Sequence, residues 1–158
     1  MKTKLFALIS CTLLLLAAGC NPNPPQPENP LKGELSAPNW QAPTDYDFGS
    51  SMTAVVKVDL TLSFPGQTED WTLTPDDELA AFMDDKCCGV GDLQEGLFWL
   101  YITEPDTPAS SAVSLRYYSK HYSNIFEAKD VFVFVNDSHE GSVAAPVTPF
   151  FAAPETKN

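Results

Sequence analysis

Apolar and polar residues alternate along residues 51–64, and this is the clearest periodic pattern in the chain. The apolar positions share one side of the alternation, and threonine, lysine, aspartate and serine occupy most of the other. A period of two over this length predicts a half-buried β-strand. We therefore expect one strand over the whole segment, with its core side formed by Met52, Ala54, Val56, Val58, Leu60 and Leu62.

Shorter apolar runs separated by turn signals fill the rest of the chain. Residues 97–103 are apolar on both faces, as in a central strand, and residues 112–118 alternate. Residues 79–83 and 87–90 flank Asp84-Asp85-Lys86, which predicts a hairpin. The remaining expected strands are a short one at 70–73, an apolar one at 131–135 and an edge strand interrupted by proline at 143–151.

These strands predict the fold class. No segment has a helical period, and residues 76–82 would make at most one turn. Seven or eight short strands with turns between them are typical of an all-β fold. We expect an antiparallel β-sandwich over residues 40–152, immunoglobulin-like or jelly-roll-like, followed by a C-terminal tail at 153–158.

The first 19 residues have the regions of a lipoprotein signal peptide. Lys2 and Lys4 give a positive start, and residues 5–16 form an apolar stretch shorter than the roughly twenty residues of a membrane span. Ala-Ala-Gly then precedes Cys20 and resembles a lipobox, with alanine where leucine is commonest. We predict cleavage before Cys20 and lipidation of its thiol. The alternative is an ordinary secretory signal cut at an Ala-x-Ala-like site, which leaves Cys20 as a thiol.

A proline-rich linker follows the predicted anchor, within residues 20–39. Five prolines lie between Pro22 and Pro30, and an extended spacer of this kind rises about 3.1 Å per residue. We expect residues 31–50 to begin docking through Trp40 and Phe48. Residue 21 is Asn and not the Asp that retains some lipoproteins in the inner membrane, which favours the outer membrane and leaves its two faces open.

Charge excludes some partners. The 158-residue chain has a net charge of −12, and removing the signal leaves seven basic against 21 acidic residues, or −14. Such a surface repels phosphate backbones, so we expect no nucleic-acid partner. Electrostatic attraction to anionic lipid is also disfavoured, so membrane association would come from the lipid on Cys20.

Several short motifs together resemble a small β-domain that recurs in bacterial surface and secreted lipoproteins. Residues 77–82 read Asp-Glu-Leu-Ala-Ala-Phe and are followed by Cys87-Cys88-Gly89-Val90, close to a D-E-(I/L)-A-A-F-x4-C-R-G-V pattern. The stretches at 116–119 and 141–142 agree with it. The resemblance covers roughly residues 40–152 and implies the β fold and an envelope location, without a settled activity. Cys88 departs from it, standing where the family has arginine.

Cys87 and Cys88 are adjacent, and neighbours on a strand point to opposite faces. We expect two thiols, with Cys87 buried and Cys88 outward. A vicinal or intermolecular disulfide is the main alternative in an oxidising compartment. A redox or metal site has less support, because no second cysteine pair or histidine cluster accompanies them.

Other candidate chemistry is weak. His121 and His139 both lie in polar, turn-like stretches, where we expect surface residues, and no hydrolase, nucleotide-binding or metalloprotease motif occurs. We therefore expect no catalysis and no cofactor. A set of acidic residues has the hard oxygens that suit Ca²⁺, but a solvated acidic turn region is the simpler interpretation; the set is Asp76, Asp77, Glu78, Asp84, Asp85 and Asp92.

The aromatic residues give the best candidate site. Strands 97–103 and 112–118 are consecutive, so we expect them to pair antiparallel. Trp99 and Tyr101 on the first strand and Arg116 and Tyr118 on the second would then form one outward patch. Aromatic rings beside a guanidinium suit a sugar or the side chains of a partner. The alternative is that the docked 31–50 segment covers Trp99 and Tyr101.

Together these patterns predict a lipid-anchored protein of the cell envelope with a β-sandwich binding module. Glycan is the first ligand class to consider. The alternative is a structural or adhesion component that pairs with an envelope protein. An enzyme acting on glycans has the least support.

Overall fold

The computed structural model describes residues 29–44, 50–68, 70–103 and 111–154. It confirms the all-β class, with one short helix among these residues. The predicted signal peptide, Cys20, Phe48 and the loop at 104–110 lie outside the described residues. The elements are β1 (Ser51–Val56), α1 (Leu60–Ser63), β2 (Glu78–Met83), β3 (Lys86–Gln94), β4 (Leu97–Thr103), β5 (Ala112–Ser119), β6 (Asn124–Val133) and β7 (His139–Glu140).

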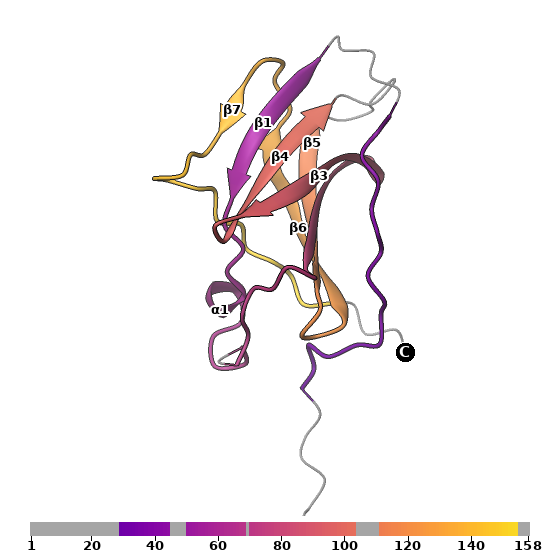
Figure 1. The fold of residues 1–158 in the computed structure, drawn as a ribbon, viewed down its shortest axis with the longest axis vertical. Coiled ribbons are helices and arrows are strands. Elements are labelled where there is room, and N and C mark those ends of the chain that lie inside the picture. Colours follow the sequence, from indigo (N-terminus) through magenta and orange to yellow (C-terminus); the bar gives the residue numbers. More distant parts are fainter. Residues whose placement is uncertain (1–28, 45–49, 69, 104–110, 155–158) are drawn as a thin grey trace, which may run out of the picture.

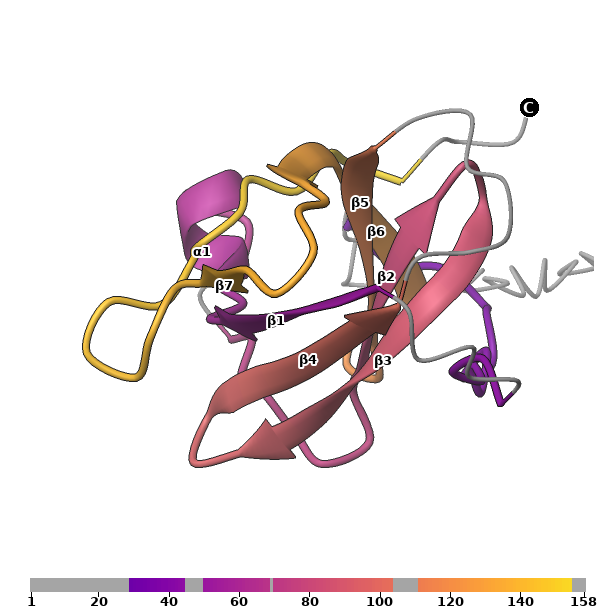
Figure 2. The same ribbon diagram turned by 90° about the horizontal axis from the view of Figure 1, so that it is seen from above.

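The seven strands form one curled, mixed sheet (Figure 1). Their order is β6-β5-β2-β3-β4-β1-β7, and every pairing is antiparallel except that of β1 with β7. The long strand β3 pairs with β2 through its first half and with β4 through its second. Because β3 is shared in this way, the half of the sheet with β5 and β6 runs in a different direction from the half with β1 and β4 when seen from above (Figure 2). The two-layer sandwich stays a prediction.

The strand predicted over 51–64 ends at Val56, so the second half of that prediction is wrong. Asp59 caps a single helical turn: its carboxylate accepts hydrogen bonds from Leu62 N at 3.2 Å and Thr61 Oγ1 at 2.6 Å. Such local bonds compete with strand pairing. Val58 just before this turn and Leu60 within it still reach the core, so apolar alternation alone did not separate the turn from a strand.

The predicted β2–β3 hairpin is confirmed. Asp84 and Asp85 have φ values of 47° and 63°, which a two-residue hairpin turn requires and which aspartate tolerates. The turn places Cys87 opposite Phe82 on the convex face, so Cys88 points into the core and is fully buried. The prediction that Cys87 is buried and Cys88 outward is therefore wrong. Gly89 follows at a bulge, where a Cβ would lie 2.5 Å from Tyr101 O.

The core on the concave side is centred on Tyr117. Trp71, Phe98, Phe126 and Phe151 surround its ring at centroid distances of 5.8–6.4 Å. Trp71 Nε1 donates a hydrogen bond to Tyr117 Oη at 3.3 Å. The short strand predicted at 70–73 is absent; these residues form a loop whose tryptophan seals the core.

Asp77, the first residue of the motif at 77–82, has a structural position. It is buried, and its carboxylate accepts hydrogen bonds from Thr74 N at 2.8 Å and Lys120 N at 2.7 Å. It therefore ties the turn before β2 to the connection after β5. A buried carboxylate needs such donors, because an unsatisfied one costs several kcal/mol.

Residues 29–44 pack on the outer side of β2 and β5, where Trp40 N donates to Glu78 Oε2 of β2 and Leu35 O accepts from Tyr118 Oη of β5. Gly33 N and Leu35 N donate to Tyr122 O and Ser123 O, both at 2.8 Å. Leu31 belongs to the hydrophobic core, so part of the predicted linker packs on the domain. Further along, Trp40 meets Phe82 edge-on at 5.7 Å, which confirms Trp40 as an anchor.

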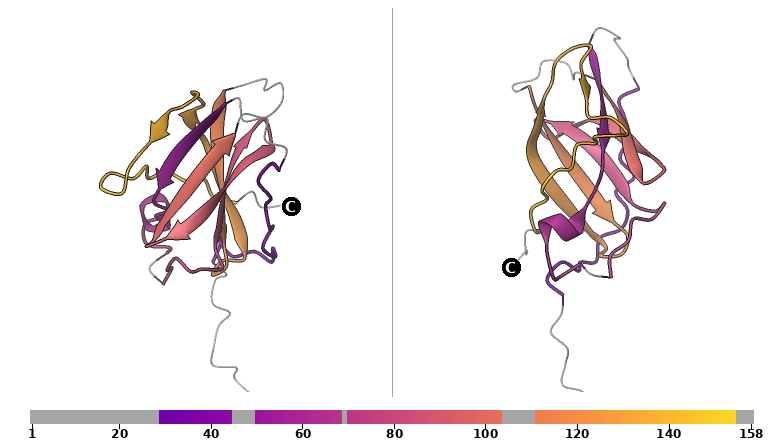
Figure 3. Two further views of the ribbon diagram at one scale, coloured as in Figure 1. Left: turned by 45° about the horizontal axis from the view of Figure 1, so that its top comes forward. Right: turned by 90° about the vertical axis from the view of Figure 1, so that its left-hand side faces the viewer.

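The chain after β7 closes the curl. Instead of the edge strand predicted at 143–151, it makes two isolated bridges, Val147 with Val56 and Ala152 with Glu127. Residues 147–152, which we call the C-terminal strap, thus pass from β1 to β6 (Figure 3, right). At about 3.4 Å per residue they span at most roughly 17 Å. Phe151 of the strap is buried, whereas Phe150 beside it is 68% exposed.

Replacing Phe151 with alanine should destabilise the domain by about 3–5 kcal/mol, because it opens a cavity beside Tyr117. Phe150→Ala is the matched control and should change the free energy of unfolding by less than about 0.5 kcal/mol. Urea unfolding followed by tryptophan fluorescence measures both. Equal effects of the two substitutions would show that the strap does not complete the core.

Candidate functional site

The four residues predicted to form one patch lie on strands that do not pair. In the sheet, β2 and β3 separate β5 from β4. Three interstrand steps of about 4.8 Å put the two strands roughly 14 Å apart along the sheet. The predicted patch of Trp99, Tyr101, Arg116 and Tyr118 is therefore wrong as a unit. Consecutive strands pair in most folds but not in all, and here a crossover separates them.

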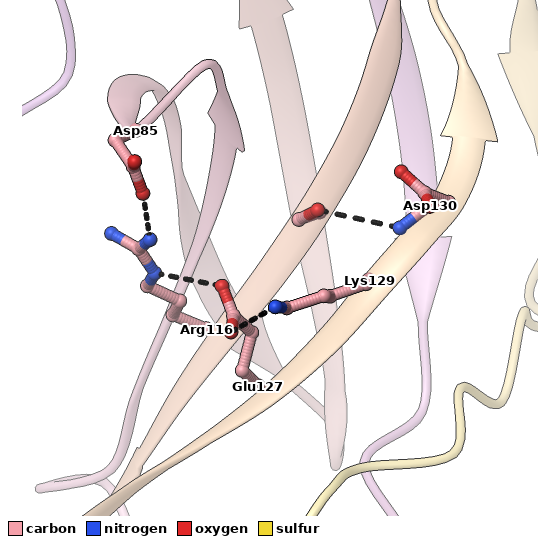
Figure 4. A network of polar contacts seen from close by, with 6 residues as sticks. Asp85, Arg116, Glu127, Lys129 and Asp130 are labelled. Atoms are coloured by element: carbon pink, nitrogen blue, oxygen red, sulfur yellow. Dashed lines mark hydrogen bonds and ion pairs between the residues drawn. The ribbon is translucent and has the colours of Figure 1, made fainter.

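Arg116 belongs to an ion network on β5 and β6 (Figure 4). Its Nε lies 3.3 Å from Glu127 Oε1, and Nη2 contacts Asp85 Oδ1 at the hairpin tip. The guanidinium also sits 4.3 Å from the centroid of the Phe82 ring. Lys129 Nζ lies 3.8 Å from the same Glu127. Arg116 thus connects the β2–β3 hairpin to β6, far from the tryptophan it was expected to join.

Tyr118 is buried, so the prediction that it points into solvent is wrong. Only 1% of it is exposed, and its Oη donates to Leu35 O at 3.2 Å. The side chain does leave the concave core, as alternation with Tyr117 requires. The docked segment of residues 29–44 then covers it.

Trp99 and Tyr101 are exposed, at 39% and 47%. The alternative in which the docked segment covers them is wrong for its described part, because that segment lies over β2 and β5 instead. Trp99 and Tyr101 lie two positions apart on β4, so both rings project from the convex side, about 6.8 Å apart along the strand. Their partners across the β1–β4 pair are Val55 and Thr53.

Thr53 and His139 complete this surface. β7 pairs with β1 so that His139 stands beside Thr53, and His139 Nδ1 lies 2.6 Å from Thr53 Oγ1. These two side chains and the two rings border a hollow of about 410 Å³, floored by Ala54 and Leu100. We call Trp99, Tyr101, Thr53 and His139 the aromatic face.

The aromatic face was only half visible in the sequence. On strand 97–103, Phe98, Leu100 and Ile102 form the more aliphatic set, which indicated Trp99 and Tyr101 for the other face, and His139 is exposed as expected. Its place beside Thr53 depends on a two-residue parallel strand that joins positions 86 residues apart. No local pattern marks such a pairing. The polar position of Thr53 between apolar neighbours was the one available signal.

Asp77, Glu78 and Asp92 of the predicted acidic set line a second groove of about 580 Å³, whereas Asp76, Asp84 and Asp85 are not among its lining residues. Asp77 is committed to two backbone N–H groups, as described above, and Glu78 Oε2 accepts from Trp40 N at 3.4 Å. No set of three His, Cys, Asp or Glu side chains arranged to hold a metal occurs in the described part of the chain. His121 lies apart from both surfaces, with Nε2 3.3 Å from Asp70 Oδ2.

The two cysteines of the hairpin are free thiols. Burial raises the pKa of Cys88 to about 12. Burial also raises the pKa of Cys87, which is half-buried, while a backbone hydrogen bond and the Arg116 guanidinium act in the opposite direction. Since the thiolate is the reactive form, neither environment activates a nucleophile.

Maleimide should therefore alkylate Cys87 well before Cys88 in the native protein near pH 8, because Cys87 is the more accessible thiol. Mass spectrometry after a time course, with Cys87→Ser and Cys88→Ser variants as controls, gives the two rates. Cys88 should react at the rate of global unfolding. A native Cys88 that reacts as fast as Cys87 would contradict the burial described here.

Within residues 29–44, 50–68, 70–103 and 111–154, no helix has the length and apolar character of a membrane span. Comparisons with protein-family models, with curated proteins and with solved structures give no match to this chain. The resemblance to small β-domains of bacterial lipoproteins stays a prediction. A functional interpretation must therefore start from the aromatic face itself.

Proposed function

We propose that this chain is a lipid-anchored protein of the cell envelope whose β-domain binds glycans through the aromatic face. The observation that carries the binding proposal is the pair of solvent-exposed rings, Trp99 and Tyr101, beside a hydrogen-bonded Thr53–His139 pair. The anchor rests on the signal sequence and Cys20, and the outer membrane is the proposed location. Neither a cofactor nor a nucleic-acid partner enters the proposal.

The chemistry of a sugar suits this arrangement. The C–H groups of a pyranose ring form an apolar face that packs on an aromatic ring, and its hydroxyls need donors and acceptors at the edge. Trp99 and Tyr101 supply the apolar area, and large aromatic side chains supply it with little loss of conformational entropy. The hollow itself is almost wholly apolar, and the hydrogen-bonded pair of Thr53 and His139 stands at its rim.

A protein partner is the second candidate function, and the exposed rings would serve it equally well. Pairing through a sheet edge has less support. Thr53 N, Lys57 N and Val55 O on the outer edge of β1 are bonded to Ser138 O, Val147 O and Val147 N. On β6, Glu127 O accepts from Ala152 N at 2.8 Å. Covered edges of this kind resist strand addition.

The finer fold prediction also belongs to this proposal. We infer that the half of the sheet with β1 and β4 and the half with β5 and β6 act as the two layers of a sandwich that share β3. The different directions of the two halves and the core between them support this view (Figure 2). The assignment of this sandwich to an immunoglobulin-like or jelly-roll-like fold stays a prediction.

The binding proposal predicts that Trp99→Ala and Tyr101→Ala each weaken glycan binding at least about tenfold, which corresponds to about 1.4 kcal/mol per ring. The lipidated full chain in detergent would be tested on a glycan array, and hits measured by calorimetry. Phe150→Ala is the matched control, since it removes a still more exposed aromatic ring elsewhere on the domain. All three variants should keep the parental unfolding free energy within about 1 kcal/mol.

Binding of no glycan at all, with the parent shown to be folded, would overturn the glycan assignment. Equal loss of binding in Phe150→Ala would show that the aromatic face has no special role.

The anchor proposal predicts that Cys20→Ala moves the protein out of the detergent-extracted membrane fraction. Two or three acyl chains hold a protein far more firmly than one, at about 0.8 kcal/mol per buried methylene. Cell fractionation and mass spectrometry of the N-terminal peptide would check it. A parent without acyl groups, and a variant that fractionates unchanged, would refute the lipid anchor.

A further inference from the structure

A carboxylate flanks the aromatic face on the side away from His139. Asp92 of β3 pairs with Trp99 of β4, and side chains of directly opposite residues project from the same face within about 5.5 Å at Cβ. Asp92 is exposed, and Gln94 Nε2 donates a hydrogen bond to its Oδ2. The indole of Trp99 is thus bordered by Val55 on one side and by an anion on the other.

The cationic groups near this face do not cancel that charge. Lys57 follows β1 by one residue, but its Nζ lies 3.9 Å from Asp59 Oδ2, which offsets it. His139, at the far side of the hollow, is engaged with Thr53. The chain as a whole carries a net charge of −12. A ligand approaching Trp99 therefore meets a negative potential, which repels anions and attracts cations.

From this charge pattern we infer that the preferred ligand is a cationic glycan, one whose amino sugars carry free ammonium groups. This inference rests on the proposed glycan-binding function and names its ligand class. An ammonium group within about 6 Å of the Trp99 ring is attracted by the ring's negative face. The same group can pair with Asp92 at the edge of the ring, while the pyranose body packs on Tyr101.

The alternatives are less favourable on the same grounds. A uronic-acid or sulfated glycan would bring its own negative charge to Asp92. A neutral or N-acetylated sugar could stack on the rings, but its acetyl group would leave the Asp92 carboxylate without an ionic partner. The inference therefore concerns preference among glycans, with anionic chains excluded and acetylated chains bound more weakly.

Three oligosaccharides of equal length test the preference: a β-1,4-linked glucosamine hexamer, its fully N-acetylated form and a galacturonate hexamer. Calorimetry on the full chain in detergent should give a roughly three- to tenfold tighter dissociation constant for the amino form than for the acetylated form. Raising the salt concentration from about 0.15 M to about 0.3 M should reduce this preference, because salt screens the attraction between the ammonium groups and Asp92. The galacturonate should not bind.

Variants separate a site from general attraction to an acidic protein. Asp92→Asn should abolish the preference by weakening binding of the amino form to the level of the acetylated form. Asp130→Asn removes another exposed carboxylate, on β6, and should leave the preference intact. Binding of a hexalysine peptide measures the non-specific attraction of a cation to this acidic protein. Trp99→Ala should leave hexalysine binding unchanged and should abolish binding of the amino hexamer.

The outcomes are distinct. Equal binding of amino and acetylated hexamers, with no effect of Asp92→Asn, overturns this inference and leaves glycan binding standing. Tighter binding of galacturonate overturns it as well. Equal loss of preference in Asp92→Asn and Asp130→Asn, or an amino hexamer that Trp99→Ala does not weaken, assigns the binding to net charge and also overturns it. If neither these hexamers nor any arrayed glycan binds the folded chain, the proposed function itself fails.

Discussion

Burial of the Tyr117 side chain is the constraint around which the rest of the domain is arranged. A tyrosine in a core needs apolar contacts for its ring and a partner for its hydroxyl. The ring takes its contacts from β4, β6, the C-terminal strap and the 70–77 loop, and the sheet must curl for these to meet. Trp71 satisfies the hydroxyl, and Asp77 lies close to it. Burial raises the pKa of Tyr117, so the hydroxyl stays protonated.

Once the concave side is filled, the convex side divides into a covered half and a bare half. Residues 29–44 cover β2 and β5, and the outer residues there, Ala80, Phe82 and Tyr118, are as buried as a core. No described segment covers the rings of β4. Two large aromatic side chains that stay 39% and 47% exposed beside a covered surface give up part of the stabilisation of full burial, which is about 1.5–3 kcal/mol for a large apolar side chain. That loss is the physical reason to look for a ligand on the aromatic face.

Local structure could be predicted from the sequence, whereas the pairing of strands distant in the chain could not. The Asp84-Asp85 turn and the strand at 97–103 were readable because they depend on neighbours in the chain. The expected pairing of β4 with β5 failed, because alternation fixes which residues share a face but not which strand lies next to it. Arg116 and Tyr118 were misplaced for this reason. The burial of Tyr118 also depends on residues 29–44, which cover it. That segment is extended and contains prolines, so it has no periodicity that shows what it covers.

Residues 51–64 show a second kind of limit. Met52, Ala54 and Val56 kept the expected face, but the alternation continued through a helical turn that begins after Asp59. One turn is too short to display a period of its own. The capping aspartate followed by Thr61 was the only local sign of it. The faces of Cys87 and Cys88 were mispredicted for a different reason. Cys87 lies opposite Phe82 and shares its face, and the sequence did not show whether Phe82 lies inside or outside the concave core.

The docked segment also sets how the domain would respond to a pull from its anchor. The described chain begins at Asn29, at the lower end of the domain in Figure 1, whereas β7 lies near the upper end. If Cys20 is lipidated as proposed, tension between the membrane and a ligand on the aromatic face enters at this lower end. This tension would load the hydrogen bonds of Gly33, Leu35 and Trp40 one after another, so these bonds would break in that order. The tether could thus lengthen by peeling these residues from the convex face before the strand ladder carries the full force.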